Sequence, residues 1–391
     1  MEQQKRYSFG QSMLARYSEG RLSFLPGIQL FSVDLSTGAV STGLSGSAYS
    51  RLTGSEVFRS GSEAGFRESV SELADLLREK QQEAPGIRVS LNLNIRRCSF
   101  MFSDGASSWY RLRAGRIALS SSGRIVYRDF GFSEDGQDLV AAVLDAYTCL
   151  AGQLSGKDTY PPAAGMDLSA DTFILPPQAA SFFVHEVVGH MLETDIWKAR
   201  KFNIPEDQPF LPGFCSLVDD PAKAGYFAYG DYDDAGNRIQ RTEAVVSGTF
   251  RECISLQRSA EYSHLPLPRM SCFALLDNPE GRNFIRMCGS YDRYIVPEEI
   301  SSGGVNPFTG DFFISTARQY LVDEKHIRYQ LPPSIYCGNV ADLCARILEI
   351  GNDSSIFLGT CTKEGQNLYV CNSAPSMVIS GLKTPGQRSG T

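Results

Sequence analysis

Hydrophobic residues in the first half of the chain recur with two different periods. From Phe66 to Leu77 they recur every three to four residues, and Pro85 and Gly86 follow, which predicts a helix over about residues 63–83. Directly afterwards, from Ile87 to Ile95, they alternate with Arg, Ser and Asn residues. Alternation with period 2 predicts a strand with one face toward water.

Two shorter alternating runs and a second helix complete this half. The runs cover about residues 110–117 and 124–130, and the Ser and Gly residues at 120–123 between them predict a meander. Apolar spacing predicts the second helix over about 138–154. The Gly- and Ser-rich stretch 36–62 has little periodicity and predicts no element.

A segment rich in Gly and Pro, residues 155–167, separates the two halves of the chain. The tandem prolines Pro161 and Pro162 cannot continue a helix or a central strand, so we place a domain boundary there. Beyond it we expect a short apolar strand at 172–175 and a helix over 179–192. Nearly every residue of this helix is apolar, which is typical of a helix buried on all sides.

Turn residues punctuate the rest of the chain. Short strand candidates from about 213 to 335 predict mostly β structure, and a last helix is expected over 340–350, with Asn339 as its N-cap and Gly351 at its end. The patterns together predict an α+β fold of two domains. These are an N-terminal α/β domain over 1–160 and a predominantly antiparallel β C-terminal domain over 168–382, followed by a flexible tail over 383–391.

Composition restricts the classes of function. The net charge is −7 and the sequence pI is about 5.3, which argues against a protein whose main task is to bind nucleic acid, because that task needs a basic face. The chain has no run of about 18 apolar residues and no apolar stretch behind its first basic residues, so we expect no membrane contact and a cytoplasmic location. Its ten cysteines are scattered without a CxxC pair, as expected of reduced thiols.

The main chemical signal is a cluster of His185, Glu186 and His190 among only four histidines. In the familiar zinc-protease helix two histidines four residues apart share one face, with a glutamate beside the first as general base. Here the spacing is five residues, which places the side chains roughly 140° apart on a regular helix. A π-bulge would bring them together, so we predict a helix distortion between Val187 and His190, with Gly189 tolerating unusual backbone angles.

An alternative is that both histidines are ordinary core residues and that Glu186 is a buried ion-pair partner. An unpaired glutamate in the apolar segment FFVHEVVGHML would be costly to ionise, however, whereas a divalent cation would compensate its charge. This argument favours the metal site.

The segment VHEVVGHMLETD resembles the HExxxH segment of the TldD/PmbA family of metalloproteases. Five later segments resemble further blocks of that family in the same order, namely GDYDDAGNRIQRTEAVVSGTF, YSHLPLPRMS, SSGGVNPFTGDFFISTARQYLV, CGNVADLCARILEIGND and GTCTKEGQNLYVCNSAPSMVISGL. The resemblance covers about residues 86–382. It departs from the family over the first 85 residues, at Met191, at Ser301 and Ser302, and at Thr362.

The resemblance implies a site and an activity. His185 and His190 would bind one zinc ion per chain with Cys361 as third ligand, and Glu186 would activate water; Cys371 is the fallback ligand. His264 and Arg269 are candidates for holding the oxyanion, although a structural role for each is the stronger expectation. Gly303 and Gly304, in the glycine-rich segment, are further candidates for substrate binding.

The implied function is a zinc-dependent metallopeptidase that hydrolyses unfolded or extended peptides, with a role in maturing ribosomally made peptides by leader removal. Its expected partner is a PmbA/TldE-like subunit or a second copy of the chain. Three alternatives remain: a zinc-dependent enzyme that tailors a peptide without cleaving it, a non-catalytic scaffold subunit, and a structural zinc site closed by a fourth protein ligand.

Overall fold

The computed structural model describes most of the chain. The described residues are 5–34, 40–42, 63–102, 104–133, 136–155, 161, 172–201, 204, 207–221, 227–259, 265–325 and 327–384. Most of the stretch 36–62, for which the sequence predicts no element, lies outside them, as do His264 and the tail beyond Thr384.

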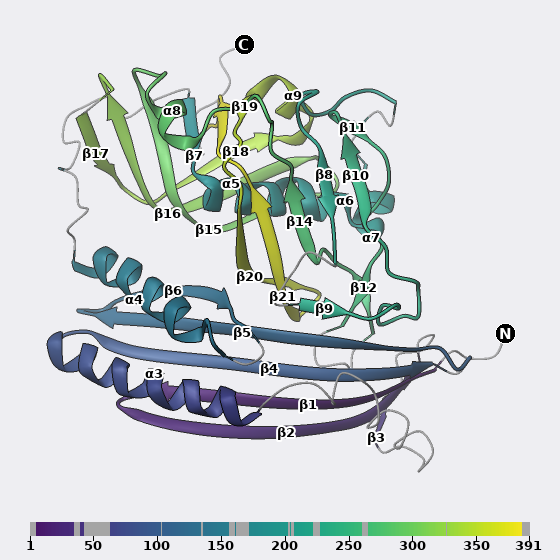
Figure 1. Ribbon diagram of the computed structural model, residues 1–391. Helices are drawn as coiled ribbons and strands as arrows, with labels where there is room; N and C mark the ends of the chain where they lie inside the picture. The colour runs from purple at the N-terminus through teal and green to yellow at the C-terminus, as the bar shows by residue number, and fades with distance from the viewer. Residues whose placement is uncertain are drawn as a thin grey trace.

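Long antiparallel strands form one sheet at the N-terminal side of the molecule, which we call the N-terminal sheet (Figure 1). Its order is β3 (Val40–Thr42), β2 (Arg21–Asp34), β1 (Lys5–Ser18), β4 (Arg88–Phe102), β5 (Ser107–Ser121) and β6 (Arg124–Gly131). The predicted strand and meander are confirmed as β4, β5 and β6. The hairpin of β1 and β2 lies within residues 5–34, for which the sequence patterns predicted no strand.

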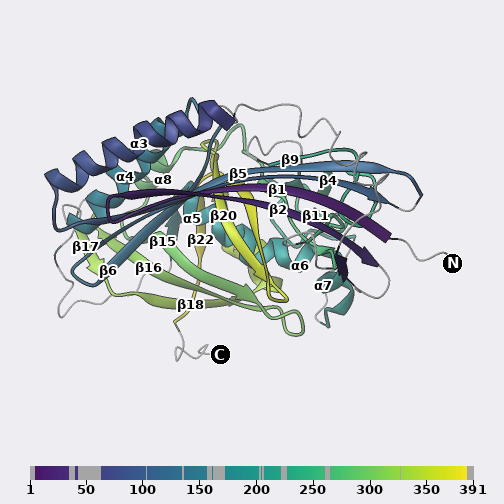
Figure 2. The same cartoon turned by 90° about the horizontal axis from the view of Figure 1, so that it is seen from below.

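Two helices cover one face of the N-terminal sheet, and the C-terminal half of the chain covers part of the other (Figures 1 and 2). Helices α3 (Glu63–Glu83) and α4 (Leu139–Ser155) confirm the two predicted helices. Their apolar sides bury Leu91 and Leu93 of β4 in one core cluster with Phe66 and Leu73 of α3. Burying each such side chain contributes about 1.5–3 kcal/mol, which holds the helices on the sheet.

The C-terminal half contains two further sheets. The β14 sheet has the order β11 (Thr249–Phe250), β10 (Thr242–Val246), β8 (Leu217–Asp219), β14 (Cys272–Leu275), β21 (Gln366–Ala374) and β20 (Ser355–Lys363). The β15 sheet has the order β17 (Ile327–Leu331), β16 (Asp311–Asp323), β15 (Tyr294–Val305), β7 (Thr172–Leu175), β22 (Met377–Ser380) and β19 (Ile347–Ile350), with β18 (Ser334–Asn339) beside β16. Strand pairs in both sheets are antiparallel except β14 with β21 and β15 with β7.

Short elements complete this half. They are α7 (Thr194–Ala199), β12 (Gln257–Arg258), β13 (Leu267–Pro268) and α8 (Phe284–Cys288), together with β9 (Phe227–Tyr229), which pairs with β5 of the N-terminal sheet. Strand pairing therefore crosses the expected boundary between the halves. The predicted α+β class agrees with this mostly sheet architecture, and the division into two domains stays a prediction.

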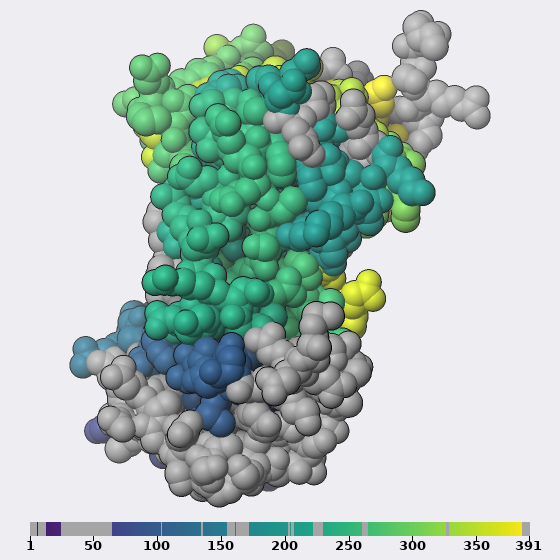
Figure 3. All heavy atoms as spheres, turned by 90° about the vertical axis from the view of Figure 1, so that its right-hand side faces the viewer, coloured from purple at the N-terminus to yellow at the C-terminus, as the bar shows by residue number. Residues whose placement is uncertain are grey.

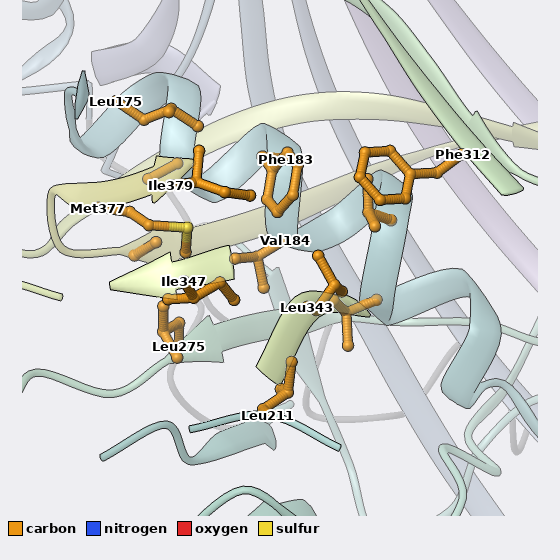
Figure 4. Packing of buried hydrophobic residues seen from close by; sticks show 14 of the residues in the cluster. Leu175, Phe183, Val184, Leu211, Leu275, Phe312, Leu343, Ile347, Met377 and Ile379 are labelled. Carbon is orange, nitrogen blue, oxygen red and sulfur yellow. The ribbon is translucent and has the colours of Figure 1, made fainter. Parts of the chain in front are cut away.

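One buried helix runs through the core that the two C-terminal sheets share. It consists of α5 (Pro177–Phe183), a π-helical segment η1 (Val184–Gly189) and α6 (His190–Leu192). Figure 4 shows Phe183 and Val184 of this helix among labelled side chains from several strands, and the Phe183 and Phe312 rings meet edge to face at 5.7 Å. The predicted all-apolar helix is thus buried, with Leu275 of the β14 sheet and Ile379 of the β15 sheet in the same cluster.

The helix expected over 340–350 is shorter than predicted. A 3₁₀ turn η3 (Val340–Asp342) and helix α9 (Leu343–Arg346) follow Asn339, whose side chain accepts from the Ala341 N–H at 2.9 Å as the predicted cap. Residues Ile347–Ile350 instead form β19, paired with β22. The pairing has a register shift between Ile347 and Glu349, and it buries both isoleucines while leaving Leu348 46% exposed. Pairing with β22 therefore overrides the helical pattern.

Two further findings concern the C-terminal segment and membrane-spanning helices. Lys383, the first residue of the expected tail, exchanges backbone hydrogen bonds with Cys337 at 2.7 and 3.1 Å. Among the described residues, no helix is both long and apolar enough to span a membrane.

Candidate metal centre

The π-helical segment brings His185 and His190 onto one side of the buried helix. The His190 N–H donates to the His185 carbonyl, which is the i to i+5 bond of a π-turn. As a result the two imidazole rings lie 4.8 Å apart at an angle of 80°. The predicted distortion is present, and it extends from Val184 to Gly189.

Gly189 is needed for space and not for an unusual backbone angle. Its φ is −61° and its ψ is −51°, which any residue adopts in a helix. A Cβ at this position, however, would overlap the Met270 sulfur and lie 2.9 Å from the Phe273 ring. The sequence pointed to the right residue for the wrong physical reason.

Each histidine has one ring nitrogen held by a neighbouring side chain. Nδ1 of His185 lies 2.7 Å from Asn372 Oδ1, and Nδ1 of His190 lies 3.1 Å from Glu193 Oε2. With the protons on Nδ1, both rings donate to these oxygens and keep the Nε2 lone pairs for a ligand. Neighbours that fix the tautomer in this way are typical of metal-binding histidines.

Cys361 completes a group of three possible metal ligands. Its Sγ lies 3.4 Å from His190 Nε2, and the ligand atoms of His185, His190 and Cys361 all lie within 4.8 Å of one another. Zinc bonds of about 2.0 Å to nitrogen and 2.3 Å to sulfur, at a tetrahedral angle, separate the two atoms by about 3.5 Å. The observed nitrogen–sulfur distance therefore fits a tetrahedral zinc.

The electrostatics of the site favour a thiolate. Burial raises the pKa of the Cys361 thiol, but hydrogen bonds and charges from His185 and His190 outweigh it and lower the pKa to about 4. Burial likewise lowers the pKa of His190, yet its bonds to Cys361 and Glu193 raise it to about 10. The site thus stabilises positive charge next to a thiolate. A bound metal cation would supply this charge in place of the protons on the histidines.

Glu186 lies beside this group of three ligands. Its Oε2 is 3.9 Å from His190 Nε2, and its side chain is 18% exposed. Burial raises its pKa, the two histidines lower it, and Cys361 and Glu193 raise it again, with a net upward shift. A carboxylate with raised pKa at this distance can accept a proton from a water molecule at the site.

Comparison with known proteins identifies the family. A family model described as the PmbA/TldA metallopeptidase C-terminal domain matches residues 170–386, more than half of the chain. The chain belongs to the PmbA/TldD family. The match begins just before β7 and contains His185, Glu186, His190 and Cys361.

Two relatives named as TldD homologues show how far the likeness extends. A metalloprotease TldD homolog of Buchnera aphidicola subsp. Schizaphis graminum is 26% identical over 221 residues, which are 52% of this chain and 45% of that protein. A zinc metalloprotease TldD homolog of Saccharolobus solfataricus is 24% identical over 313 residues, 73% of this chain and 66% of that protein. The chain therefore spans about half the length of the first relative.

A solved structure shares the fold over nearly the whole length. The crystal structure of TldE from Thermococcus kodakarensis superposes with a TM-score of 0.65 over 97% of this chain and 96% of its own, at 11% identity. At this identity the likeness establishes the fold alone. It includes the N-terminal region, where the sequence resemblance to the PmbA/TldD family is absent.

In this PmbA/TldD chain, Cys361 lies on a hairpin of β20 and β21 that we call the Cys361 hairpin. Arg269 is completely buried and donates through Nη2 to the Cys361 carbonyl at 2.7 Å and through Nη1 to the Gln366 carbonyl at 3.1 Å. These bonds give Arg269 a structural role in fixing the hairpin, as expected, and its two Nη groups are occupied by main-chain carbonyls.

The other candidate residues fall in different places. A Cβ on Gly303 would lie 3.0 Å from Glu186 Cβ, so this glycine packs directly on the proposed base, whereas Gly304 lies near the Phe313 ring. Cys371, the fallback ligand, is buried beside Cys272 on the neighbouring strand, in a different apolar cluster from the helix. The position of His264 lies outside the described residues.

Three residues with contacts around the site escaped the sequence reasoning, namely Asn372, Glu193 and Lys363. Lys363 donates to Glu193 Oε2 and Asp195 Oδ1, both at 2.8 Å. Burial raises the pKa of Glu193, but His190 and Lys363 outweigh this effect, so that the pKa is lowered. The only sequence signal was position: Glu193 comes three residues after His190, and Lys363 two after Cys361. Asn372 is 187 residues from His185 and Lys363 is 170 residues from Glu193, so these two contacts become visible only in the fold.

Proposed function

We propose that the chain is a zinc-dependent peptidase that hydrolyses extended peptides. The observation that carries the proposal is the convergence of two histidine nitrogens and a thiolate from distant parts of the chain beside Glu186. Three protein ligands with a position left for water are typical of catalytic zinc, whereas a structural site is closed by a fourth. The relatives named metalloproteases support the assignment.

The residues of the chain divide the work between them. When bound, zinc supplies the charge that acidifies the attacking water and polarises the scissile carbonyl. Glu186 accepts the proton from this water at a carboxylate oxygen and returns it to the leaving amine. Asn372 and Glu193 hold the two imidazoles in orientation, and Arg269 fixes the main chain that carries Cys361.

Strand β15 supports an extended peptide as substrate. One edge of β15 pairs with β16 along its length, but among the described residues its other edge pairs with β7 only at Ile295. Beyond Ile295 the strand runs past Gly303, which contacts Glu186. A peptide added to this edge would be bound mainly through its backbone, with little sequence preference, which suits leader removal and maturation of ribosomally made peptides.

We further infer that the chain works as the catalytic member of an assembly in the cytoplasm, paired with a PmbA/TldE-like subunit or a second copy of itself. The proposal rests on the fold shared with TldE and on the presence of all four groups of the site in this chain. A non-catalytic scaffold subunit would need neither Glu186 nor the three possible metal ligands beside it.

The decisive substitution is Glu186→Gln. It should leave close to one zinc per chain, because Glu186 is not a ligand, while cleavage of an unfolded peptide falls on the order of 10²–10⁴-fold with loss of the general base. Elemental analysis gives the zinc content, and mass spectrometry of the peptide gives the cleavage rate. Glu280→Gln, which neutralises an exposed carboxylate, is the control.

Two results would overturn the proposal. Normal cleavage by Glu186→Gln would remove the assigned mechanism. A product of altered mass with an unbroken backbone would instead show a peptide-tailoring enzyme, since hydrolysis adds water and splits the chain.

A further inference from the structure

A second concave site lies between the N-terminal sheet and the Cys361 hairpin. It has a volume of about 590 Å³, and we call it the Arg96 cleft. Its lining residues from β4 and β5 are Asn92, Asn94, Arg96, Tyr110, Leu112 and Arg116, and the hairpin contributes Thr360, Gly365, Asn367, Leu368 and Tyr369. Figure 1 shows the end of the hairpin directly above β5, and Figure 3 shows the teal and green atoms of the C-terminal half next to blue atoms of the N-terminal half.

The polar residues of β4 point into the cleft because of strand alternation. Asn92, Asn94 and Arg96 are two residues apart, so they share the face of β4 opposite to the buried Leu91 and Leu93. Farther along the same face, Cys98 and Phe100 are apolar and buried against the C-terminal half. The change from apolar to polar on one face marks where the two layers stop packing and an open site begins.

The lining of the cleft contains two arginines, Arg96 and Arg116, and no acidic residue. Arg116 is held by Asp129 at 2.6 and 2.8 Å and lies 3.4 Å from Thr360 Oγ1. Arg96 is half-buried, and its guanidinium makes no hydrogen bond or ion pair with the side chains that the structure describes, although its charge acts on Tyr110 and Tyr369. A guanidinium in such a setting favours a carboxylate, with which it can form two parallel bonds.

We propose that the Arg96 cleft binds a carboxylate-bearing segment of an extended peptide, away from the metal centre. The carboxylate pairs with Arg96, and the side-chain amides of Asn92, Asn94 and Asn367 bond to the peptide backbone. The net charge of the chain is −7, so the molecule as a whole does not attract an acidic peptide. The local positive charge of Arg96 selects it. That the ligand is a peptide rests on the proposed function.

The position of the cleft relates it to the substrate. Cys361 points toward the two histidines, while its neighbour Thr360 lines the cleft on the opposite face of the hairpin. A peptide that occupies both sites passes around the turn at Glu364 and Gly365. The cleft therefore selects acidic residues several positions from the bond that is cut.

The test measures binding without cleavage. Zinc-loaded Glu186→Gln protein, with its partner subunit where one is required, is titrated against a fluorescent acidic peptide by fluorescence polarisation. Adding Arg96→Gln should raise the dissociation constant about tenfold, the effect of one charge-assisted hydrogen bond. A peptide with Gln in place of its acidic residues should bind both proteins equally and weakly.

Arg88→Gln is the matched control, because Arg88 is exposed on the same strand but lies outside the cleft. Equal weakening by Arg88→Gln and Arg96→Gln, or an equal effect of Arg96→Gln on the acidic and neutral peptides, overturns the proposal. The C-terminus of the peptide can also be amidated. If amidation removes the effect of Arg96→Gln, and replacing the acidic residues of the peptide by Gln does not, the bound group is the end of the peptide. The assignment to acidic side chains is then wrong.

The same experiment separates this inference from the proposed function. Binding that depends on Arg96 in a protein whose wild-type form cleaves no peptide would refute the peptidase and leave the cleft standing. If the wild type cleaves peptide but binding does not depend on Arg96, the peptidase assignment stands and the proposal for the cleft is refuted.

Discussion

At the scale of single residues, the site depends on side chains that never touch the reacting atoms. Asn372 and Glu193 fix the two imidazoles through Nδ1, and Arg269 holds the backbone of Cys361. Such neighbours commonly change metal affinity by 10–100-fold because they set the tautomer and orientation of the ligand. The ligands are thus positioned by residues from three separate segments of the chain.

The corresponding prediction concerns Asn372→Ala. The His185 ring loses its partner at 2.7 Å, so zinc affinity should fall about 10–100-fold. Competition with a chromogenic zinc chelator measures this affinity. Asn367→Ala serves as control because Asn367 lies on the same strand but lines the Arg96 cleft; equal losses in both variants would show a general defect of the hairpin.

At the scale of elements, two pieces of secondary structure meet at Glu186. The π-helical segment carries the residue, and β15 passes so closely that a side chain at position 303 would have to push Glu186 aside. A Cβ there would lie 3.0 Å from Glu186 Cβ and 3.1 Å from its Cγ, whereas a Cβ on Gly304 would meet the Phe313 ring at an ordinary 3.4 Å. The helix and the strand therefore position the base together.

We expect Gly303→Ala to displace the Glu186 side chain. Because a misplacement of about 1 Å can cost on the order of 10²-fold in rate, peptide cleavage should fall by roughly 10–100-fold while one zinc per chain is kept. Gly304→Ala should cleave at nearly the wild-type rate. Steady-state kinetics with parallel zinc analysis compares the two variants, and equal activities would show that β15 does not position the base.

At the scale of the whole molecule, the N-terminal sheet is attached to the C-terminal half by a buried ion pair. Arg6 of β1 has no exposed surface, lies 3.5 Å from Asp234 Oδ2, and donates through Nη1 to the Asp234 carbonyl at 2.9 Å and to Ser259 Oγ at 3.1 Å. Asp234 belongs to the acidic turn whose neighbour Asp233 accepts four hydrogen bonds. This contact joins parts of the chain 228 residues apart.

Removing one partner of this pair should destabilise the protein. Arg6→Ala leaves the Asp234 carboxylate buried without its cation, which typically costs about 3–5 kcal/mol in the free energy of unfolding. In a chain of this size the melting temperature should fall by roughly 4–6 °C. Differential scanning calorimetry measures it, and Arg16→Ala, at an exposed position of the same strand, should change it little; equal shifts would contradict a special role for Arg6.

The sequence by itself determined the elements whose periodicity is strong and local. Helices α3 and α4, strands β4 to β6 and the buried helix follow from apolar spacing, and the spacing of His185 and His190 required a π-turn, because two ligands on opposite sides of a helix cannot share one ion. Where the pattern was short, tertiary pairing decided: Ile347–Ile350 became a strand because β22 was there to receive it.

Only the tertiary structure decided what surrounds the site. The resemblance named Cys361, but its approach to His190 depends on a hairpin held by Arg269. The roles of Asn372 and Gly303 arise from contacts between segments far apart in sequence. The Arg96 cleft likewise exists only because two sheets meet and then diverge. The sequence pattern of a helix or strand indicates which of its faces is buried. A site forms where faces of different elements come into contact, and such a contact leaves no pattern in the local sequence.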